Sequence, residues 1–327
     1  MNTSSFDCIM TNTLKTTLAT SAICTTLIAA SQSITPQVVA TSGTHYSSSG
    51  HSLSWTIGES ATATLSDPSN TLTQGFHQPE QVLVSINIKA FLQGPYRSIS
   101  GLMHDSLRAQ GLIPLSEPYS ALGYSNINGG AENLDPSVLN TTGPNAIIDW
   151  VHVELRDKTD DQNVIATRNA LLQADGDIVE VDGISPVEFD AASDDYYLSI
   201  QHRNHVHIMS FSTVALSDSP VAVDFSDGST PTFGTEAQVD ISGTKALWSG
   251  DVTDDGIVKY TGSLNDRDPI LVAIGGMIPT NTIAGYLPDD VNMDGTVKYT
   301  GASNDRDLIL QNIGGVVPTN TRSEQMP

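Results

Sequence analysis

Residues 147–156 read IIDWVHVELR, and this stretch decides the fold class. If the stretch is a strand, alternate residues point to opposite faces. One face then carries Ile147, Val151, Val153 and Leu155 together with Asp149, and the other carries His152, Glu154 and Arg156. A period of two is typical of a strand with one face in a core and one in solvent. We therefore predict a half-buried β-strand over 147–156.

Further strand candidates flank this one, with turn signals between them and no intervening long helical pattern. They are the Val- and Ile-rich stretches 82–92, 164–173, 178–181, 196–209 and 221–225. Asp175-Gly176 separates two of them and predicts a hairpin turn, because this dipeptide accepts positive φ. One short helix, over 101–110, is compatible with the series. The pattern predicts an antiparallel β-sandwich over residues 81–247.

The charge balance excludes several classes of partner. The 327 residues carry 37 acidic and 14 basic side chains, for a formal net charge of −23. Binding to a phosphate backbone or to anionic lipid needs Lys and Arg, so we expect neither nucleic acid nor membrane insertion. Such an acidic chain suits a soluble protein that is partly neutralised by bound cations.

The N-terminus predicts export. Lys15 precedes the apolar run 18–30, and the small residues at 29–31 provide a cleavage site, so residues 1–33 are expected to be a signal peptide. Cys8 and Cys24 both lie inside this segment, and the mature protein would then lack disulfides. We expect a secreted protein, extracellular or at the cell surface. Residues 34–80 form a Ser/Thr-rich β segment with too little chain for a core of its own.

The last quarter of the chain, residues 248–327, is an internal duplication. Asp251–Thr282 and Asp290–Thr321 align with an offset of 39 residues and are identical at 22 of 32 positions. Both copies open with Asp-Val-x-x-Asp-Gly and continue through Val-Lys-Tyr-Thr-Gly and Asn-Asp-Arg-Asp to Gly-Gly. In each copy the Gly-Gly pair is expected to end a short helix, and the two units are expected to pack as one module.

The opening of each repeat matches the first half of an EF-hand calcium loop, in which every second residue turns an oxygen inward. The expected ligands are Asp251, Thr253, Asp255 and the carbonyl of Ile257 in the first repeat, and Asp290, Asn292, Asp294 and the carbonyl of Thr296 in the second. Thr253 is the weaker ligand, so the first site should bind less tightly. The closing acid is Asp266 or Asp268 in the first repeat and Asp305 or Asp307 in the second, and the sequence leaves both registers open.

Two tandem calcium loop–helix units on an acidic secreted chain resemble a dockerin. From Trp55 onward the chain also resembles a group of uncharacterised secreted proteins of Bacteroidota-type bacteria, some of which carry haemagglutinin-like labels. The resemblance implies Ca²⁺ as cofactor and adhesion or docking as function. The expected partners are copies of the chain or a cell-surface or extracellular protein, and glycans. We also consider that residues 34–80 pair with a neighbouring subunit and build surface fibres.

No enzyme signature is visible, and we expect a non-enzymatic protein. His202, His205 and His207 could suggest zinc, but His205 and His207 would share one strand face with His202 on the other, without a completing Cys or Glu. Asp149, Glu154 and Asp157 are candidates for glycoside hydrolysis only because they are acids near a strong strand. The main alternative is a carbohydrate-binding module with a docking tail, in which Trp150, Tyr196 and Tyr197 stack on sugar.

Overall fold

The computed structural model describes the strands between residues 42 and 73 and all of residues 83–327. The expected signal peptide and both cysteines lie outside the described residues. The chain divides into two compact units, Met1–Glu80 and Gln81–Pro327. In the first unit, β1 (Ser42–Ser48) pairs antiparallel with β2 (His51–Ile57), and β3 (Thr64–Asp67) pairs antiparallel with β4 (Asn70–Thr73).

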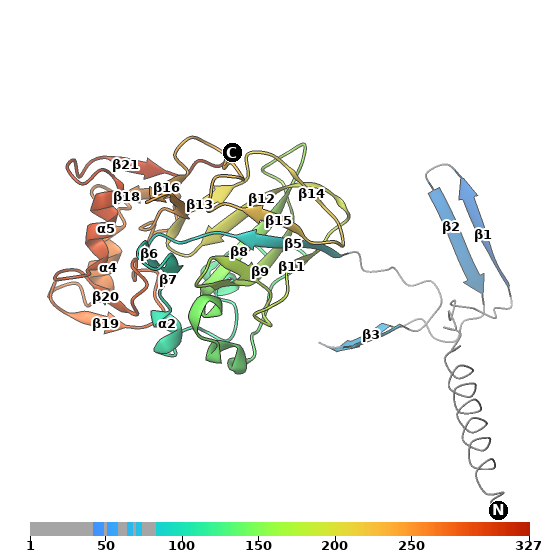
Figure 1. The fold of residues 1–327 in the computed structure, drawn as a ribbon, viewed down its shortest axis with the longest axis horizontal. Helices are drawn as coiled ribbons and strands as arrows, with labels where there is room; N and C mark the ends of the chain where they lie inside the picture. The colour runs from blue at the N-terminus through green and yellow to red at the C-terminus, as the bar shows by residue number, and fades with distance from the viewer. Residues whose placement is uncertain (1–41, 49–50, 58–63, 68–69, 74–82) are drawn as a thin grey trace, which may run out of the picture. The chain divides into compact units, whose positions relative to one another are not determined.

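The second unit is built on a nine-stranded sheet (Figure 1). Its strands are β5 (Leu83–Lys89), β8 (Ile147–Asp157), β9 (Val164–Gln173), β10 (Asp177–Val179), β11 (Val187–Asp190), β12 (Asp194–His202), β13 (His205–Met209), β14 (Val214–Leu216) and β15 (Val221–Asp224). All neighbours are antiparallel except β15, which runs parallel to β5. This large antiparallel sheet confirms the mainly β class.

The sheet curls back toward its own beginning. β14 pairs with β12, the last strand but one at one end of the strand order, and the chain then turns into β15, which pairs with β5, the last strand but one at the other end. In the linking turn, the Ser85 amide donates to the Ser217 carbonyl. All nine strands thus belong to one hydrogen-bonded sheet, whereas a sandwich has two. The sandwich arrangement therefore stays a prediction.

Strand β8 is buried on both faces, so the predicted half-buried strand is wrong. The first ten of its residues are all buried, including His152, Glu154 and Arg156. The segment 104–135 covers the face that we assigned to solvent: Tyr119 and Tyr124 pack their rings against His152. The alternation of residue types reported the two faces correctly, but it cannot show that a distant loop covers the polar one.

The structure agrees better with the predicted turn than with the predicted bounds of the longer strands and of the helix. β9 and β10 form the expected hairpin around Gly176, whose φ is +92°. The stretch 196–209 is a tight hairpin of β12 and β13 rather than one strand. The predicted helix 101–110 is reduced to α2 (Ser106–Ala109), because its first residues form β7 (Leu102–Met103), which pairs with β6 (Tyr96–Arg97).

The remaining short elements are α3 (Tyr119–Leu122), the 3-10 turns η1 (Pro136–Asn140) and η2 (Gly143–Asn145), and the hairpin β16 (Gln238–Ile241) with β17 (Thr244–Leu247). The repeats then add β18 (Ile257–Lys259), α4 (Arg267–Ala273), β19 (Thr282–Ala284), β20 (Thr296–Lys298), α5 (Asp305–Asn312) and β21 (Thr321–Ser323). The repeats lie together at one end of this unit, drawn in orange and red (Figure 1).

The two repeats exchange their strands. β18 of the first repeat pairs with β21, which follows the helix of the second, and β20 of the second repeat pairs with β19, which follows the helix of the first. A second contact is exchanged in the same way: Thr261 donates to the Pro318 carbonyl and Thr300 to the Pro279 carbonyl. Each repeat is therefore completed by the other.

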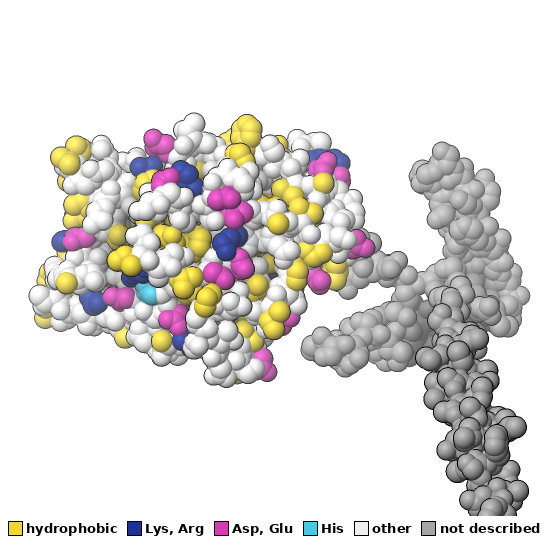
Figure 2. All heavy atoms as spheres, in the orientation of Figure 1, with side chains coloured by type: hydrophobic (Ala, Val, Ile, Leu, Met, Phe, Trp, Pro, Cys, Tyr) yellow, Lys and Arg dark blue, Asp and Glu magenta, His cyan; other side chains and the backbone are white. Residues whose placement is uncertain are grey.

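The repeats are also fixed to the sheet, and residues 81–327 form one compact unit. The Gln93 carboxamide contacts both Ser249 and Asn312 of α5. Gly94 passes so close to the second repeat that a Cβ there would lie 2.3 Å from the Val291 carbonyl oxygen. On the face shown in Figure 2, acidic side chains are scattered among Lys and Arg rather than gathered in one area.

Candidate metal centres

Each repeat opens with an aspartate whose carboxylate is wrapped by main-chain amides. Asp251 accepts from the amides of Asp255 and Gly256 at 3.1 and 2.9 Å. Asp290 accepts from the amides of Asp294 and Gly295 at 3.1 and 2.8 Å. The two loops therefore curl around the first aspartate in the same way.

The backbone of the two loops also agrees where it is least usual. The fourth loop residue has positive φ in both, at +55° for Asp254 and +59° for Met293. The sixth is Gly256 or Gly295, with φ of +74° and +88°. A glycine at this sixth position is what the sharp turn of an EF-hand loop requires.

A second aspartate closes each loop from the start of the following helix. Asp266 accepts from the amides of Val252 and Lys259 and from the Thr253 hydroxyl. Asp305 accepts in the same way from the amides of Asn292 and Lys298. Each closing carboxylate thus joins the beginning of its loop to the short strand that follows.

These four carboxylates are fully buried, and none pairs with a Lys, Arg or His among the described residues. Burial, together with the charge of Asp266, raises the pKa of Asp251 to about 7. Burial raises the pKa of Asp290 to about 6 and that of Asp305 to about 8. The pKa of Asp266 is also raised by burial, against the opposing effect of its amide donors. The charges of Arg203 and His207 oppose the shifts of Asp290 and Asp251 without outweighing burial. Each loop thus holds two buried acids that have no ion-pair partner among the described residues.

The other predicted ligands line the same loops. The Thr253 hydroxyl lies 3.0 Å from Asp266, and the Asn292 carboxamide oxygen lies 2.8 Å from the Asp294 amide. Asp255 is exposed and Asp294 is partly buried, and each pairs with the lysine four residues on, Lys259 or Lys298. Ile257 and Thr296 begin β18 and β20, and their amides donate to Asp255 and Asp294.

The structure separates the two registers that the sequence left open. In both repeats the side-chain oxygen of an asparagine accepts from the amide of the acid three residues on, and its Nδ2 donates to the carboxylate of that acid, Asn265 with Asp268 and Asn304 with Asp307. Asp268 and Asp307 also pair with the neighbouring Arg267 and Arg306 on the outer side of the helix. The carboxylates that face the loops are Asp266 and Asp305. Pro269 falls inside the first helical turn rather than at its first position, so Asp268 is not the cap.

The donor chemistry fits a hard cation. Each loop presents carboxylate, amide or hydroxyl oxygens and main-chain carbonyls, which is the ligand class that Ca²⁺ prefers. Within the part of the chain that the structure describes, no group of three or more His, Cys, Asp and Glu side chains is close enough to hold a metal by itself. A calcium site here would therefore depend on neutral oxygens beside its two buried carboxylates.

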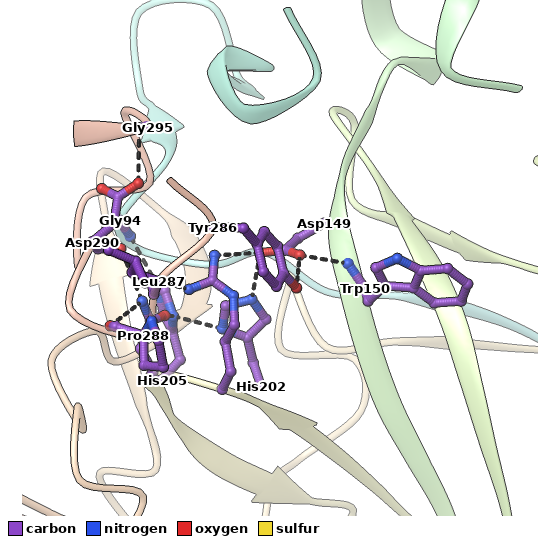
Figure 3. A network of polar contacts seen from close by, with 12 residues as sticks. Gly94, Asp149, Trp150, His202, His205, Tyr286, Leu287, Pro288, Asp290 and Gly295 are labelled. Carbon is purple, nitrogen blue, oxygen red and sulfur yellow. Dashed lines mark hydrogen bonds and ion pairs between the residues drawn. The ribbon is translucent and has the colours of Figure 1, made fainter. Parts of the chain in front are cut away.

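A buried ionic network that sequence reasoning missed lies next to the second loop (Figure 3). Asp149 of β8 accepts from Arg203 at 2.8 Å and from the Tyr286 hydroxyl at 2.6 Å, and its other neighbour is His202 at 3.2 Å. Burial is the largest effect on Asp149 and opposes its ionisation, but the Arg203 charge together with the hydrogen bonds from His202 and Tyr286 outweighs it and lowers the pKa to about 2. In the sequence, the only sign of this network is that Asp149 falls on the apolar side of the 147–156 alternation.

The histidines do not lie as the strand pattern predicted. His202 and His205 face each other directly across the β12–β13 turn, with their Nδ1 atoms 3.0 Å apart, and both are fully buried. The tight turn places them on one face, which a single continuous strand would not do. His207 lies apart, between Asp254 and Glu324. Burial lowers its pKa, but hydrogen bonds to these two acids outweigh that effect and raise it to about 10.

The groups considered for sugar binding and hydrolysis are occupied elsewhere. Trp150 is fully buried and donates its indole N–H to the Pro114 carbonyl, and Tyr196 is buried as well, so the proposed stacking platform is wrong. Glu154 pairs with Arg156 inside the fold. Asp157 accepts from Thr159 in the turn after β8. Trp150 and Tyr196 belong to the core because β8 and β12 are central strands.

None of the helices among the described residues combines the length and apolar character of a membrane span. No protein-family model and no curated protein matches the sequence. Among solved structures, a chain of a type II cohesin–X–dockerin complex from Acetivibrio cellulolyticus, an N-terminal interface mutant, is similar to this chain. The two share 19% identity and a TM-score of 0.24, over 50% of this chain and 79% of that chain.

Proposed function

We propose that this is a secreted, non-enzymatic calcium-binding protein with a structural or adhesive role outside the cell. Two Ca²⁺ ions, one in each repeat, fasten the repeats into a dockerin-like pair. This pair also packs against the segment after β5, through Gln93 and Gly94. The role of the ions is structural, since both loops are built into the fold rather than exposed on a mobile arm.

One observation supports this proposal above the others. Each loop buries two carboxylates completely and supplies them with main-chain amides but with no basic side chain. Leaving an ionised carboxylate buried without a counter-charge costs several kcal/mol, about 3–5 when an ion pair is broken. A divalent cation among these oxygens removes that cost and converts it into folding free energy.

The proposed ligands of the first ion are Asp251, Thr253, Asp255, Asp266 and the Ile257 carbonyl. Those of the second are Asp290, Asn292, Asp294, Asp305 and the Thr296 carbonyl. Asp268 and Asp307 leave the set because they bond the side chains of Asn265 and Asn304 and pair with Arg267 and Arg306. Residues 83–327 contain no cysteine, so metal ions take the place that disulfides have in many secreted proteins.

Calorimetric calcium titration of residues 34–327 tests the proposal. We expect two bound ions and a raised melting temperature. Asp290→Asn should remove one ion, because it removes a buried ligand. Asp307→Asn makes the same chemical change in the same repeat but at a helix cap, and it should leave both ions bound.

Two results would contradict the proposal. Absence of heat and of any melting shift at millimolar calcium would mean that the loops are turns without metal. Loss of an ion in Asp307→Asn but not in Asp305→Asn would restore the other register, in which the acid bonded to the capping asparagine is the ligand.

The adhesive part of the proposal is supported by apolar side chains that the repeats leave in solvent. Leu264, Val272, Met277, Ile278, Ile283, Val316 and Val317 are all exposed. Exposed apolar patches commonly mark protein–protein contacts. The partner is a second copy of the chain or another extracellular protein.

Residues 34–80 provide the self-assembly part of the proposal. Their strands form two separate two-stranded hairpins, and isolated hairpins are marginal without a partner sheet. Deleting residues 34–80 should abolish oligomers in sedimentation velocity while leaving calcium binding intact. Oligomers of unchanged size would contradict a role of this segment in assembly.

A further inference from the structure

Asn204 lies in the turn between β12 and β13, outside the repeats, and is fully buried. It is one of two residues that join His202 to His205. A buried asparagine in a two-residue turn must have its amide and its main chain satisfied from nearby segments. For Asn204 these partners are two segments, 287–290 and 248–250, each of which leads into one of the calcium loops.

The side chain of Asn204 holds the entrance of the second loop. Its Nδ2 donates to the Pro288 carbonyl and to the Asp290 carbonyl, both at 2.9 Å. Asp290 is the first proposed ligand of that loop. The neighbouring Arg203 donates to the Leu287 carbonyl at 2.7 Å. The turn therefore holds the segment 287–290 by hydrogen bonds to three of its carbonyls (Figure 3).

The main chain of Asn204 holds the entrance of the first loop. Its carbonyl accepts from the Gly250 amide at 2.9 Å, one residue before Asp251. On the same side, His205 bridges to Ser249, and the Val206 amide donates to the Trp248 carbonyl. One residue therefore contacts the entrance of both loops.

The orientation of the Asn204 amide is fixed by its surroundings. Gly94 donates its amide to His205 Nε2 at 3.2 Å, so that nitrogen accepts and His205 Nδ1 carries the proton. Nδ1 donates to the Asn204 oxygen at 2.8 Å, which leaves Nδ2 of Asn204 toward the two carbonyls. His202 completes the chain by donating from Nε2 to Asp149. The unprotonated Nδ1 of His202 lies 3.0 Å from His205 Nδ1 and shares the single proton of that nitrogen with the Asn204 oxygen.

The two loops also share an apolar cluster with this hairpin. Val252 and Val291, the second residues of the loops, pack in one cluster with Val206 of β13. A shift of either loop entrance would therefore displace the turn and the contacts of the other loop.

We propose that Asn204 is a positioning residue that couples the two calcium loops, so that an ion in one loop strengthens binding in the other. This inference rests on the proposed calcium binding. An ion in the second loop fixes Asp290, and Asn204 transmits that order to Gly250 and Asp251. The reverse holds equally, because coupling between two binding sites is reciprocal.

The coupling can be measured without altering Asn204. The calcium affinity of the first loop is determined with the second loop intact and with it disabled by Asp290→Asn, and the converse is done with Asp251→Asn. We expect the remaining loop to bind roughly five- to hundredfold more weakly in each case, the usual range of coupling between sites.

Asn204→Ala is then compared with two variants that contact only one loop. Gln110→Ala removes a hydrogen bond to the Asp294 carbonyl, and Tyr124→Phe removes one to Asp254. Asn204→Ala should weaken both sites and reduce the coupling ratio to about two or less. The two control variants should each weaken one site and leave the coupling ratio unchanged.

The outcomes separate the inference from the proposed function. A wild-type protein that binds no calcium overturns both. Two ions bound independently, with equal affinities in the intact and disabled backgrounds, overturn the coupling alone. A coupling ratio that survives Asn204→Ala in a protein with wild-type circular dichroism overturns the role of Asn204.

Discussion

Lys259 and Lys298 occupy equivalent positions in the two loops, and each pairs with a proposed ligand. Lys298 Nζ lies 3.0 Å from Asp294 and Lys259 Nζ lies 2.9 Å from Asp255. A cation beside a ligand lowers the negative charge of the site, and the charge of the ligand set is what tunes calcium affinity. The lysines should therefore hold the affinity below what the oxygens alone would give.

Lys298→Met should tighten calcium binding in the second loop. The methionine keeps an apolar stem while removing the charge, and we expect a gain of roughly tenfold, or about 1.4 kcal/mol. Calorimetry in the Asp251→Asn background isolates this site. Lys245→Met removes a lysine paired with Asp240 outside the loops and serves as the control. Weaker binding in Lys298→Met would show that the lysine organises the loop rather than opposing the ion.

The buried aspartates predict that the stability of the calcium-free protein falls as pH rises and that calcium removes this dependence. Their folded pKa values, about 6 for Asp290, about 7 for Asp251 and about 8 for Asp305, lie above the unfolded value near 4. Between pH 4 and pH 8 the folded state then binds more protons than the unfolded state, so its stability falls as pH rises. Calcium replaces those protons and should abolish the fall.

Melting temperatures measured from pH 5 to pH 8, with a chelator and with calcium, test this. The two curves should diverge as pH rises. Parallel curves would contradict the assignment of these acids as ligands.

At the scale of the element, the exchanged strands explain why the unit is duplicated. Hydrogen-bonded pairs alternate along an antiparallel ladder. Gly256 accepts from Glu324 and Gly295 from Gly285, so the next bonded pairs are Val258 with Arg322 and Val297 with Ile283. Each loop is braced by the tail of the other repeat.

Proline in these tails should therefore weaken the distant loop rather than its own. Arg322→Pro removes the amide opposite Val258 and should weaken the first site roughly tenfold, about the effect of one ladder hydrogen bond. Ile283→Pro is the equivalent change in the first repeat and should weaken the second site. Arg322→Ala keeps the amide and controls for the lost side chain, which contacts Trp248. Weakening of the loop within the same repeat would contradict the exchange.

At the scale of the whole molecule, the repeats and the sheet fold as one body. The contacts of Gln93 with Ser249 and Asn312 and of Asn204 with both loops cross the boundary that sequence repetition suggests near residue 248. A domain joined by buried hydrogen bonds unfolds as a unit. Calcium bound at one end should then stabilise the entire sheet.

Scanning calorimetry of residues 81–327 should show one transition that calcium moves upward as a whole. At a calcium concentration a hundredfold above the dissociation constant, each site contributes about 2.7 kcal/mol. A shortened chain ending at residue 250 should lose cooperative unfolding. Two transitions in the longer protein, only one of them calcium-dependent, would show that the repeats are an independent module.

Local signals in the sequence predicted local structure well. Asp175-Gly176 predicted the β9–β10 hairpin, and the 39-residue repeat predicted two loops of the same backbone, because φ and ψ are set by neighbouring residues. Asp251 and Asp290 could be singled out from spacing alone. Asp266 could not be separated from Asp268 as the ligand, because the choice depends on which of the two bonds the side chain of Asn265.

The sequence by itself determined the mainly β class, the hairpin turns and the repetition of the loops, because each rests on residues adjacent in the chain. Only the tertiary structure decided that β8 is buried on both faces, that the repeats exchange strands and that Asn204 contacts both loops. These features depend on contacts between different segments of the chain, such as Arg203 with Asp149, 54 residues apart, and Asn204 with Asp290, 86 residues apart. Pairings of this kind are selected by the packing of the whole chain, and no periodicity along it records them.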